Sequence, residues 1–504
     1  MLFGHPKGLY VLFMTEMWER FSYYGMRALL ILYMMDHFKF DDEGAIAIYG
    51  SFTALIFILP VFGGWLADKV LGFRKAVVFG AILMSLGHFG MLFEGSPAIE
   101  QITEAGVMEV SRDEASLQIL YLSLSLLICG VGFLKPNITS IVGLLYPKDS
   151  YERDSGFTVF TWGIMVGAAL APISCGYLGQ TYGWGYGFGL AGIGMLFGLV
   201  IFLYGQRYLI GIAEAPDSTR LHRKLLGIIT VEYVIYLGTG LVVLFIWQTV
   251  QYASLVGYLL SSQLTLVTIG IIGFAIWRLE KKERDRTFAA LLVFLVTALF
   301  AIFIEQYGSS LLLFSERVVN KEVLGIEIRS SQLVGLLPAF LMLLAPFFAW
   351  LWGYLDRNHI NPGSFHKFGI AFVFQALAYA VIWFATRGEV GDEQVGLIWL
   401  VMMFLLFAIS DMWIIPIGMS AVSKLSTNNM IGLMMGAYML ALSAGYYGAA
   451  LVAQFSVVSP EATNQELTSH YNLFFGYLSV SAAIVGLGLI LCAPLLGKLL
   501  HGVR

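Results

Sequence analysis

The chain has 504 residues, of which 58% are hydrophobic and only 12% charged, with a formal net charge of −4. Soluble domains usually carry about 25% charged residues, so this composition, with its mean hydropathy of +0.79, excludes a soluble protein and indicates a polytopic membrane protein. The three cysteines lie in apolar segments without CxxC or histidine spacing, which argues against a disulfide scaffold or a cysteine metal site.

Apolar runs long enough to cross the bilayer core, about 30 Å thick, recur along the whole chain. Fourteen membrane-spanning helices are expected, near residues 8–35, 46–67, 76–94, 116–145, 156–178, 186–206, 226–250, 255–277, 288–314, 331–355, 367–386, 396–423, 430–456 and 471–498. Twenty Lys and Arg residues fall in the loops of one side and six in those of the other. The positive-inside rule therefore places both termini in the cytoplasm of a multi-pass protein of the cytoplasmic (inner) membrane.

Two charged stretches, 207–224 and 278–286, separate the spans into groups of six, two and six. We therefore expect an all-α membrane protein with an N-terminal six-helix bundle at 1–222, an inserted helical pair at 223–285 and a C-terminal six-helix bundle at 286–504. Two such halves are typical of a transporter whose site lies between them near the membrane midplane.

The first span contains the stretch TEMWERFSYYGMR, with four ionisable residues where lipid-compatible residues are expected. Glu16, Glu19 and Arg20 are spaced i, i+3 and i+4, so they share one helix face. Tyr23 and Arg27 continue that face. Charged groups inside a membrane normally face a polar interior, so each is a candidate functional residue. A static ion pair between helices would explain Arg20 and one glutamate, but not the second glutamate and the second arginine.

The stretch GGWLADKVLGFRK ends the second span and continues into a loop predicted to be cytoplasmic. Its glycines, starting at Gly63, permit close approach between helices. Asp68 is expected to cap or pair with a neighbouring helix, and Arg74 and Lys75 to hold the interface. The pattern indicates a cytoplasmic gating loop instead of a substrate site.

The fourth span contains Lys135 followed by Pro136. Proline removes a helical hydrogen bond and kinks the helix. A lysine at this depth would lose its charge unless a carboxylate pairs with it. A Lys–Glu pair across helices would make a switch that protonation of the acid releases; a fixed salt bridge is the alternative interpretation.

The rest of the chain adds three acids within spans. Glu232, in the inserted pair, is interpreted as structural or interfacial. Glu305 is the lone acid of its span and could bind a proton or oppose a positive end of a substrate. Asp411 stands alone among apolar residues. No GxxxxGK[ST] or HExxH motif occurs, so the sequence indicates neither ATP hydrolysis, nor a metal site, nor an enzyme.

These motifs together carry a family resemblance over nearly the whole chain. GGWLADKVLGFRK resembles the loop motif of the major facilitator superfamily. TEMWERFSYYG resembles the ExxER-F-x-YY signature of the proton-dependent oligopeptide transporter (POT/PTR) family, and FLKPNI, EQYGSS and LGH are similar to its fourth, seventh and third helices. The resemblance implies a major facilitator fold with twelve core helices, two extra helices between the halves, alternating access and proton-coupled import of di- and tripeptides.

The resemblance also implies roles for individual residues. The proton-coupling residues would be Glu16, Glu19, Arg20, Lys135 and Glu305. The substrate-binding residues would be Tyr23, Arg27, Phe57, Lys135, Met165, Glu305, Leu337 and Tyr438. A gate salt bridge would join Lys135 to Asp411, which stands where the family has a glutamate. The cytoplasmic gating loop would use Gly63, Asp68 and Arg74.

Five positions depart from the family pattern, and most of the changes remove polarity. Met165 and Leu337 stand where asparagine is usual, and Phe57 where tyrosine is usual. Ala301 and Tyr438 stand where tryptophan is common. Because an apolar pocket discriminates differently from one built for hydrogen bonding, we hypothesise a bulkier or more hydrophobic peptide, or a peptide-like metabolite.

Two alternatives to peptide symport stay open. One is a major facilitator carrier for a non-peptide anion or conjugate, such as nitrate, an amino-acid conjugate or a peptide-like chelator. The other is a membrane receptor or scaffold that senses a ligand without transporting it. The expected partners of the symporter are a small peptide or peptide-like substrate, protons and the lipid bilayer. No nucleic acid and no cofactor beyond the coupling protons are expected, and the protein is expected to function as a monomer.

Overall fold

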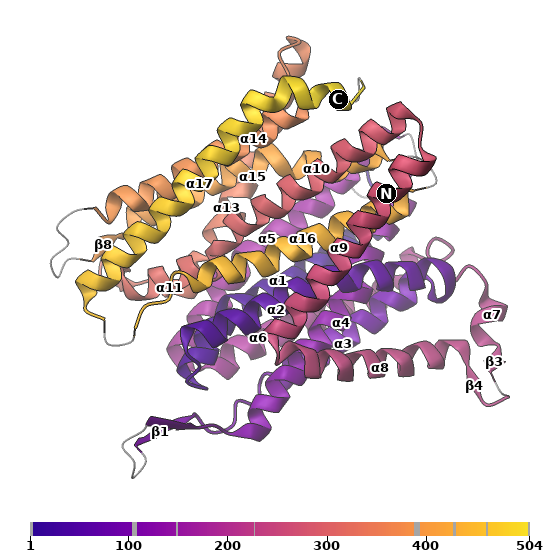
Figure 1. Cartoon of the computed structure of the whole chain (residues 1–504). Helices are drawn as coiled ribbons and strands as arrows, with labels where there is room; N and C mark the ends of the chain where they lie inside the picture. The colour runs from indigo at the N-terminus through magenta and orange to yellow at the C-terminus, as the bar shows by residue number, and fades with distance from the viewer. Residues whose placement is uncertain are drawn as a thin grey trace. The chain divides into compact units, whose positions relative to one another are not determined.

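The computed structural model describes residues 4–102, 108–147, 150–225, 227–387, 394–426, 430–459 and 462–501. Long helices dominate it, and the strands form small two-stranded sheets in the connecting loops (Figure 1). The chain divides into two compact units, Met1–Val256 and Gly257–Arg504, here called the first and second units.

The first unit is built on six long helices. They are α1 (Lys7–Asp36), α2 (Asp42–Leu66), α3 (Phe73–Gly90), α4 (Glu114–Leu144), α5 (Tyr151–Tyr182) and α6 (Trp184–Gly205). The shorter elements are the π-helical turn η1 (Ala67–Leu71), β1 (Ile99–Ile102), β2 (Met108–Ser111), η2 (Gln206–Tyr208), α7 (Ser218–His222), β3 (Lys224–Leu225) and β4 (Ile229–Thr230). Helix α1 packs against α5 and α6, and α4 packs against α2 and α3. The charged helix α1 is therefore enclosed by apolar helices.

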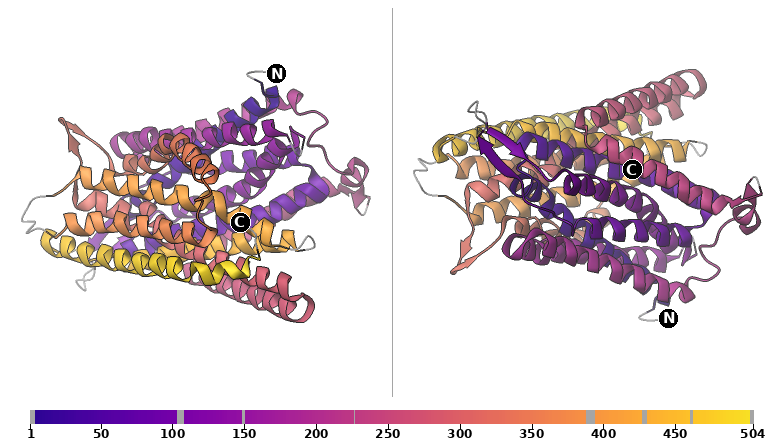
Figure 2. Two further views of the ribbon diagram at one scale, coloured as in Figure 1. Left: turned by 90° about the horizontal axis from the view of Figure 1, so that it is seen from above. Right: turned by 90° about the horizontal axis from the view of Figure 1, so that it is seen from below.

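The second unit contains six further long helices besides most of α9 (Ala253–Arg278), which is described below. They are α10 (Lys281–Ile304), α13 (Leu336–Arg357), α14 (Ser364–Ala385), α15 (Leu397–Leu425), α16 (Ile431–Gln454) and α17 (Asn464–Leu499). The short elements are η3 (Glu305–Gly308), α11 (Ser310–Arg317), β5 (Val319–Asn320), β6 (Glu322–Val323), β7 (Ile326–Glu327), α12 (Ser330–Leu333) and β8 (Val395–Gly396). The yellow helix α17 runs along α14, and α10 packs against α16 (Figure 2).

The predicted number of spans is confirmed. Within the described residues, twelve helical segments are long and apolar enough to cross a membrane. Helices α1 and α3 bring the number to fourteen. Helix α1 is less apolar because of its ionisable residues, and α3 because it begins beside Arg74 and Lys75. The arrangement is the predicted all-α membrane architecture, with fourteen long helices among the described residues.

The two inserted helices are α8 (Val231–Val250) and α9 (Ala253–Arg278), and α8 belongs to the first unit. Lys75 on α3 forms an ion pair with Glu232 at 2.7 Å. The rings of Phe79 and Tyr236 lie 4.4 Å apart, which adds an apolar contact between the same two helices. Glu232 therefore holds an interface. The boundary between the units lies within α9, and the three-part division at 222 and 285 stays a prediction.

Helices α2 and α4 cross at close range where both carry glycine. A Cβ at Gly63 would collide with the backbone carbonyl of Gly132. Pro136 has no N–H to donate to that carbonyl, which lies one turn earlier in α4. The Asn137 side chain donates to the Phe133 carbonyl at 2.6 Å and reaches the Gly63 carbonyl at 3.4 Å. The close helix approach predicted at Gly63 is therefore present.

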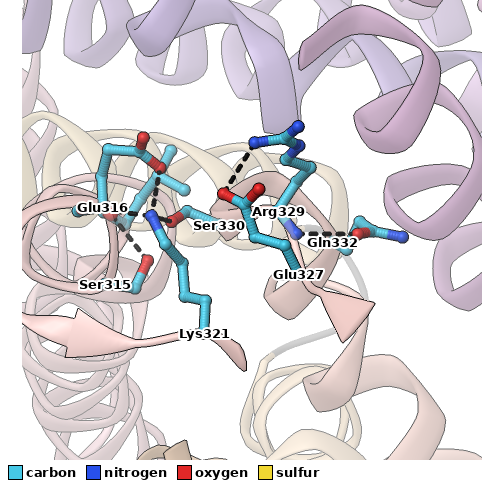
Figure 3. A network of polar contacts seen from close by, with 8 residues as sticks. Ser315, Glu316, Lys321, Glu327, Arg329, Ser330 and Gln332 are labelled. Atoms are coloured by element: carbon cyan, nitrogen blue, oxygen red, sulfur yellow. Dashed lines mark hydrogen bonds and ion pairs between the residues drawn. The ribbon is translucent and has the colours of Figure 1, made fainter. Parts of the chain in front are cut away.

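A polar network fixes the connection between α11 and α13 in the second unit (Figure 3). The Lys321 ammonium donates to the Glu316 carboxylate at 3.1 Å and to the Ser330 hydroxyl at 3.2 Å. The Arg329 guanidinium donates to Glu327 at 2.8 Å, which ties β7 to the start of α12. The network holds α11 in place, and α11 directly follows the turn that carries Glu305.

Candidate transport site

The charged face predicted for α1 forms a compact buried cluster. The Arg20 guanidinium donates through Nη2 to Glu19 Oε1 at 2.5 Å and through Nε to Glu19 Oε2. Its Nε lies 3.6 Å from Glu16 Oε1, and the guanidinium stands over the Tyr23 ring, 5.1 Å from the centroid. The other oxygen of Glu16, Oε2, is buried and has no hydrogen-bond partner among the described residues. Arg20 thus holds Glu19 tightly and Glu16 loosely.

Arg27 meets a residue that the sequence analysis did not single out. Its Nε donates to the Tyr49 hydroxyl at 2.6 Å, and its guanidinium lies 5.5 Å from the centre of the same ring. Tyr49, Thr53 and Phe57 are spaced i, i+4 and i+8, so they share one face of α2. That spacing, in a span with few other polar groups, is the signal that would have identified Tyr49.

Lys135 on α4 extends toward the same region of the first unit. Its ammonium lies over the Phe57 ring, 5.3 Å from the centroid. Glu16 and Glu19 attract it electrostatically, whereas Arg20 and Arg27 repel it. The first unit therefore brings together three cations and two carboxylates from α1 and α4. Met165, on α5, is half buried.

The second unit holds two buried carboxylates. Glu305 lies in η3, the tight turn between α10 and α11, and is 6% exposed. Asp411 on α15 is equally buried, and the negative charge of Glu305 repels it electrostatically. Gln306 anchors the turn by donating to the Ala449 carbonyl at 2.9 Å and accepting from the Ser310 hydroxyl at 2.6 Å. The break between α10 and α11 is therefore held in a fixed position.

The other predicted pocket residues of the second unit are buried. Leu337 lies in the first turn of α13 and is 5% exposed. Tyr438 on α16 shares a hydrogen bond with Thr297, and its ring lies 6.0 Å from Phe294. Ala301 packs against Gly445 where α10 and α16 cross closely. A tryptophan side chain at Ala301 would not fit this crossing.

The predicted gating loop differs from expectation at one position. Asp68 pairs with Lys69, its chain neighbour, at 2.9 Å instead of with a neighbouring helix, because both side chains lie exposed on η1. Arg74 holds an interface as predicted: it donates to Gln206 at 2.7 Å and forms an ion pair with Glu214. The Lys135–Asp411 gate joins residues of different units and stays a prediction.

The fold and the buried charge clusters define a class of protein, a multi-pass membrane transporter of the major facilitator type. The sequence model of the POT family matches residues 74–469, and the chain belongs to this family. The predicted resemblance is confirmed.

Curated relatives and a solved structure extend the match to almost the whole chain. The uncharacterized transporter YclF of Bacillus subtilis is 32% identical over 99% of this chain and 96% of its own length. Peptide transporter YePEPT of Yersinia enterocolitica is 32% identical over 89% of this chain and 88% of its own. A crystal structure of a mutant of peptide transporter POT in complex with alafosfalin has a TM-score of 0.82, 31% identity, and coverage of 100% of this chain and 97% of that one.

Proposed function

We propose that this protein is a proton-coupled symporter that imports di- and tripeptides or peptide-like compounds by alternating access. Membership of the POT family supports transport, and the similarity to YePEPT and to the transporter crystallised with alafosfalin supports a peptide-like substrate. The observation that carries the proton coupling is the buried cluster of Glu16, Glu19, Arg20 and Lys135. Protons serve as the coupling ion, with no other cofactor and no enzymatic step, and the protein works as a monomer in the cytoplasmic membrane with both termini inside.

The unequal contacts of Arg20 with Glu19 and Glu16 supply the coupling step. Glu16 has a buried oxygen without a hydrogen-bond partner in the described structure, so it has room to accept a proton. Protonation removes one of the two negative charges that balance Arg20 and Lys135, and one cation then becomes available to a substrate carboxylate. The membrane potential contributes about 2.3 kcal/mol per charge and 100 mV. The protein alternates between its outward-facing and inward-facing states if the proton and the substrate bind these two states with different affinities.

Charged residues recognise the two ends of the substrate in this proposal. Arg27, held by Tyr49, and Lys135 provide positive charge for a substrate carboxylate. Glu305 provides negative charge for an amine. Phe57, Met165 and Leu337 replace polar groups that would otherwise hydrogen-bond a peptide backbone. We therefore expect hydrophobic side chains to increase the affinity of a peptide.

The test is uptake into liposomes that contain the purified protein. An inward proton gradient should drive accumulation of a labelled dipeptide, and Lys135→Ala should abolish accumulation while leaving counterflow exchange. Lys281→Ala, at the exposed start of α10, is the matched control and should behave as wild type. Full accumulation by the Lys135 variant would refute its coupling role, and no uptake of any peptide would refute the substrate class.

A carrier for a non-peptide anion or conjugate is the second candidate. It is favoured by the excess of positive charge in the first unit, where Arg20, Arg27 and Lys135 face two carboxylates, and by the three apolar replacements. A screen of nitrate and amino-acid conjugates in the same liposomes separates the two candidates. Acidification of the liposome interior upon substrate addition would exclude a receptor that does not transport.

A further inference from the structure

The second unit contains a cavity of about 680 Å³ away from the residues assigned to transport. It lies between the ends of α13, α14, α15 and α17 that the positive-inside rule assigns to the cytoplasm, and Val293 in the middle of α10 also lines it. Neither Glu305 nor Asp411 lines it, and neither do Leu337 and Tyr438. Its volume is within the range of about 300–1,000 Å³ that is usual for small-molecule sites.

The walls of the cavity are rich in positive charge. Lys367, Lys424, His359 and His366 line it, and Asp356 is the one acidic side chain among the lining residues. Asp356 and Lys424 both act electrostatically on Lys367, so these three charges lie close to one another. At neutral pH the two lysines outweigh the single carboxylate, and a protonated histidine would add to the excess. The cavity therefore favours an anion.

The ammonium of Lys367 is partly positioned by an aromatic ring. It lies 4.2 Å from the centre of the Trp352 ring, in a cation–π contact, and is half buried. The ring fixes the lysine without neutralising it, because the contact transfers no charge. The lysine therefore stays available to a bound anion.

One backbone feature of the same wall also suits an anion. Helix α14 begins after Gly363 with no side-chain cap, so its first backbone N–H groups and the positive end of its dipole are available next to His366 and Lys367.

The end of α17 leaves room for a ligand and gives it an apolar neighbour. A Cβ at Gly497 would meet nothing within 4 Å. Six and two residues earlier, Leu491 and Leu495 are 78% and 64% exposed, on a helix expected to face lipid. An anionic group inside the cavity could thus carry acyl chains that lie along α17.

We propose that this cavity binds a phosphate-bearing anion. The ligand is either the headgroup of an anionic phospholipid of the cytoplasmic leaflet or a small soluble phosphate ester. Phosphate matches the combination of two lysines, histidines and a helix N-terminus, and basic pockets between helices on this side of a membrane bind such headgroups. The proposal goes beyond peptide transport and does not depend on it.

The test measures binding to the purified full-length protein by native mass spectrometry. The delipidated protein is titrated with phosphatidylglycerol, with phosphatidylcholine, or with glycerol 3-phosphate. Wild type should prefer phosphatidylglycerol to phosphatidylcholine, or should bind glycerol 3-phosphate. In Lys367→Gln/Lys424→Gln, the affinity should fall about tenfold or more, in line with the attraction of an anionic surface for each lysine. The control is Lys281→Gln/Lys282→Gln, an exposed pair in the same unit that lies outside the cavity.

A second variant distinguishes the contribution of the cavity's space from the contribution of its positive charge. Gly497→Leu leaves both lysines in place but adds a bulky side chain at a residue that lines the cavity, so it should weaken binding as well. Loss confined to phosphatidylglycerol identifies the lipid headgroup as the source, and loss of glycerol 3-phosphate binding identifies a soluble ester. The proposal is overturned if neither phosphate ligand binds, or if the control pair loses as much affinity as the cavity pair. If Gly497→Leu does not fold, as judged by its thermal unfolding, the comparison of the two lysine pairs decides.

Discussion

Arg20 divides its guanidinium unequally between two carboxylates, and this asymmetry separates their roles. Both contacts with Glu19 are short, whereas Glu16 lies 3.6 Å away. All three side chains are at most 3% exposed. Breaking a buried pair by removing one partner destabilises by about 3–5 kcal/mol, because the remaining charge is left without compensation. Glu19 is therefore expected to contribute more to stability, and Glu16 more to the titration that drives transport.

Substitution by glutamine at each position tests this division. Glu19→Gln should lower the free energy of unfolding by about 3 kcal/mol, since Arg20 loses its closest partner. Glu16→Gln should keep nearly wild-type stability but lose proton-driven accumulation, since it removes the proposed proton acceptor. Thermal unfolding in detergent and liposome uptake measure the two effects. Equal stability of the two variants, or full accumulation by Glu16→Gln, would contradict the assignment.

The Tyr49 hydroxyl gives a second prediction at the scale of a residue. It accepts from Arg27 at 2.6 Å, and a hydrogen bond to a charged group contributes about 1.5–3 kcal/mol. Tyr49→Phe keeps the ring under the guanidinium but releases Nε, so Arg27 should bind the substrate carboxylate less well. We expect KM for a dipeptide to rise about tenfold with little change in maximal rate. Tyr233→Phe, on the exposed side of α8, is the control with the same chemical change. An unchanged KM would show that Tyr49 does not orient Arg27.

The helices could be predicted from the sequence because the hydropathy, length and residue spacing that define each one lie within a single continuous segment. Hydropathy and length defined the fourteen spans, and the i, i+3, i+4 spacing identified the face shared by Glu16, Glu19 and Arg20. Contacts between separate helices were not predictable, because no local pattern states which helix lies next to another. The Arg27–Tyr49 hydrogen bond, the repulsion between Glu305 and Asp411, and the attachment of α8 to α3 all depend on packing.

At the scale of a secondary-structure element, the close crossing of α2 and α4 leads to a prediction about Gly63. Gly63→Ala would push a methyl group into the Gly132 carbonyl, and backbone on both sides leaves no flexible group to move. Overpacking of this kind typically costs about 1–3 kcal/mol. Gly238→Ala, in the interior of α8 with open space around it, should instead be neutral or stabilising by about 0.5–1 kcal/mol. Thermal unfolding of both variants measures this difference in stability. A Gly63→Ala variant as stable as Gly238→Ala would show that α2 and α4 can move apart at no cost in free energy.

At the scale of the whole molecule, the two compact units show how far the order of spans along the chain predicts the grouping of the helices. Charged loops predicted three groups of helices, whereas the chain divides into two compact units with the boundary inside α9. The loops did not indicate that α8 packs against the first unit through Lys75 and Glu232, because charge in a loop marks where a span ends and not which bundle it joins. The substrate is a property of the same kind, since no local sequence pattern states which side chains contact it.

Substrate choice therefore gives the prediction that involves the whole molecule. In the proposed pocket, Phe57, Met165 and Leu337 are expected to offer apolar surface where polar groups would bind a peptide backbone. One added apolar group on a substrate changes discrimination by about 10- to 200-fold. A phenylalanine-containing dipeptide should therefore compete for uptake at least about tenfold better than Ala-Ala. Met165→Asn should narrow this difference by improving Ala-Ala, whereas Leu170→Asn, which adds the same amide to an exposed position of α5, should not. Competition of Ala-Ala and the hydrophobic dipeptide with equal potency in wild type would show that the apolar replacements do not shape the pocket.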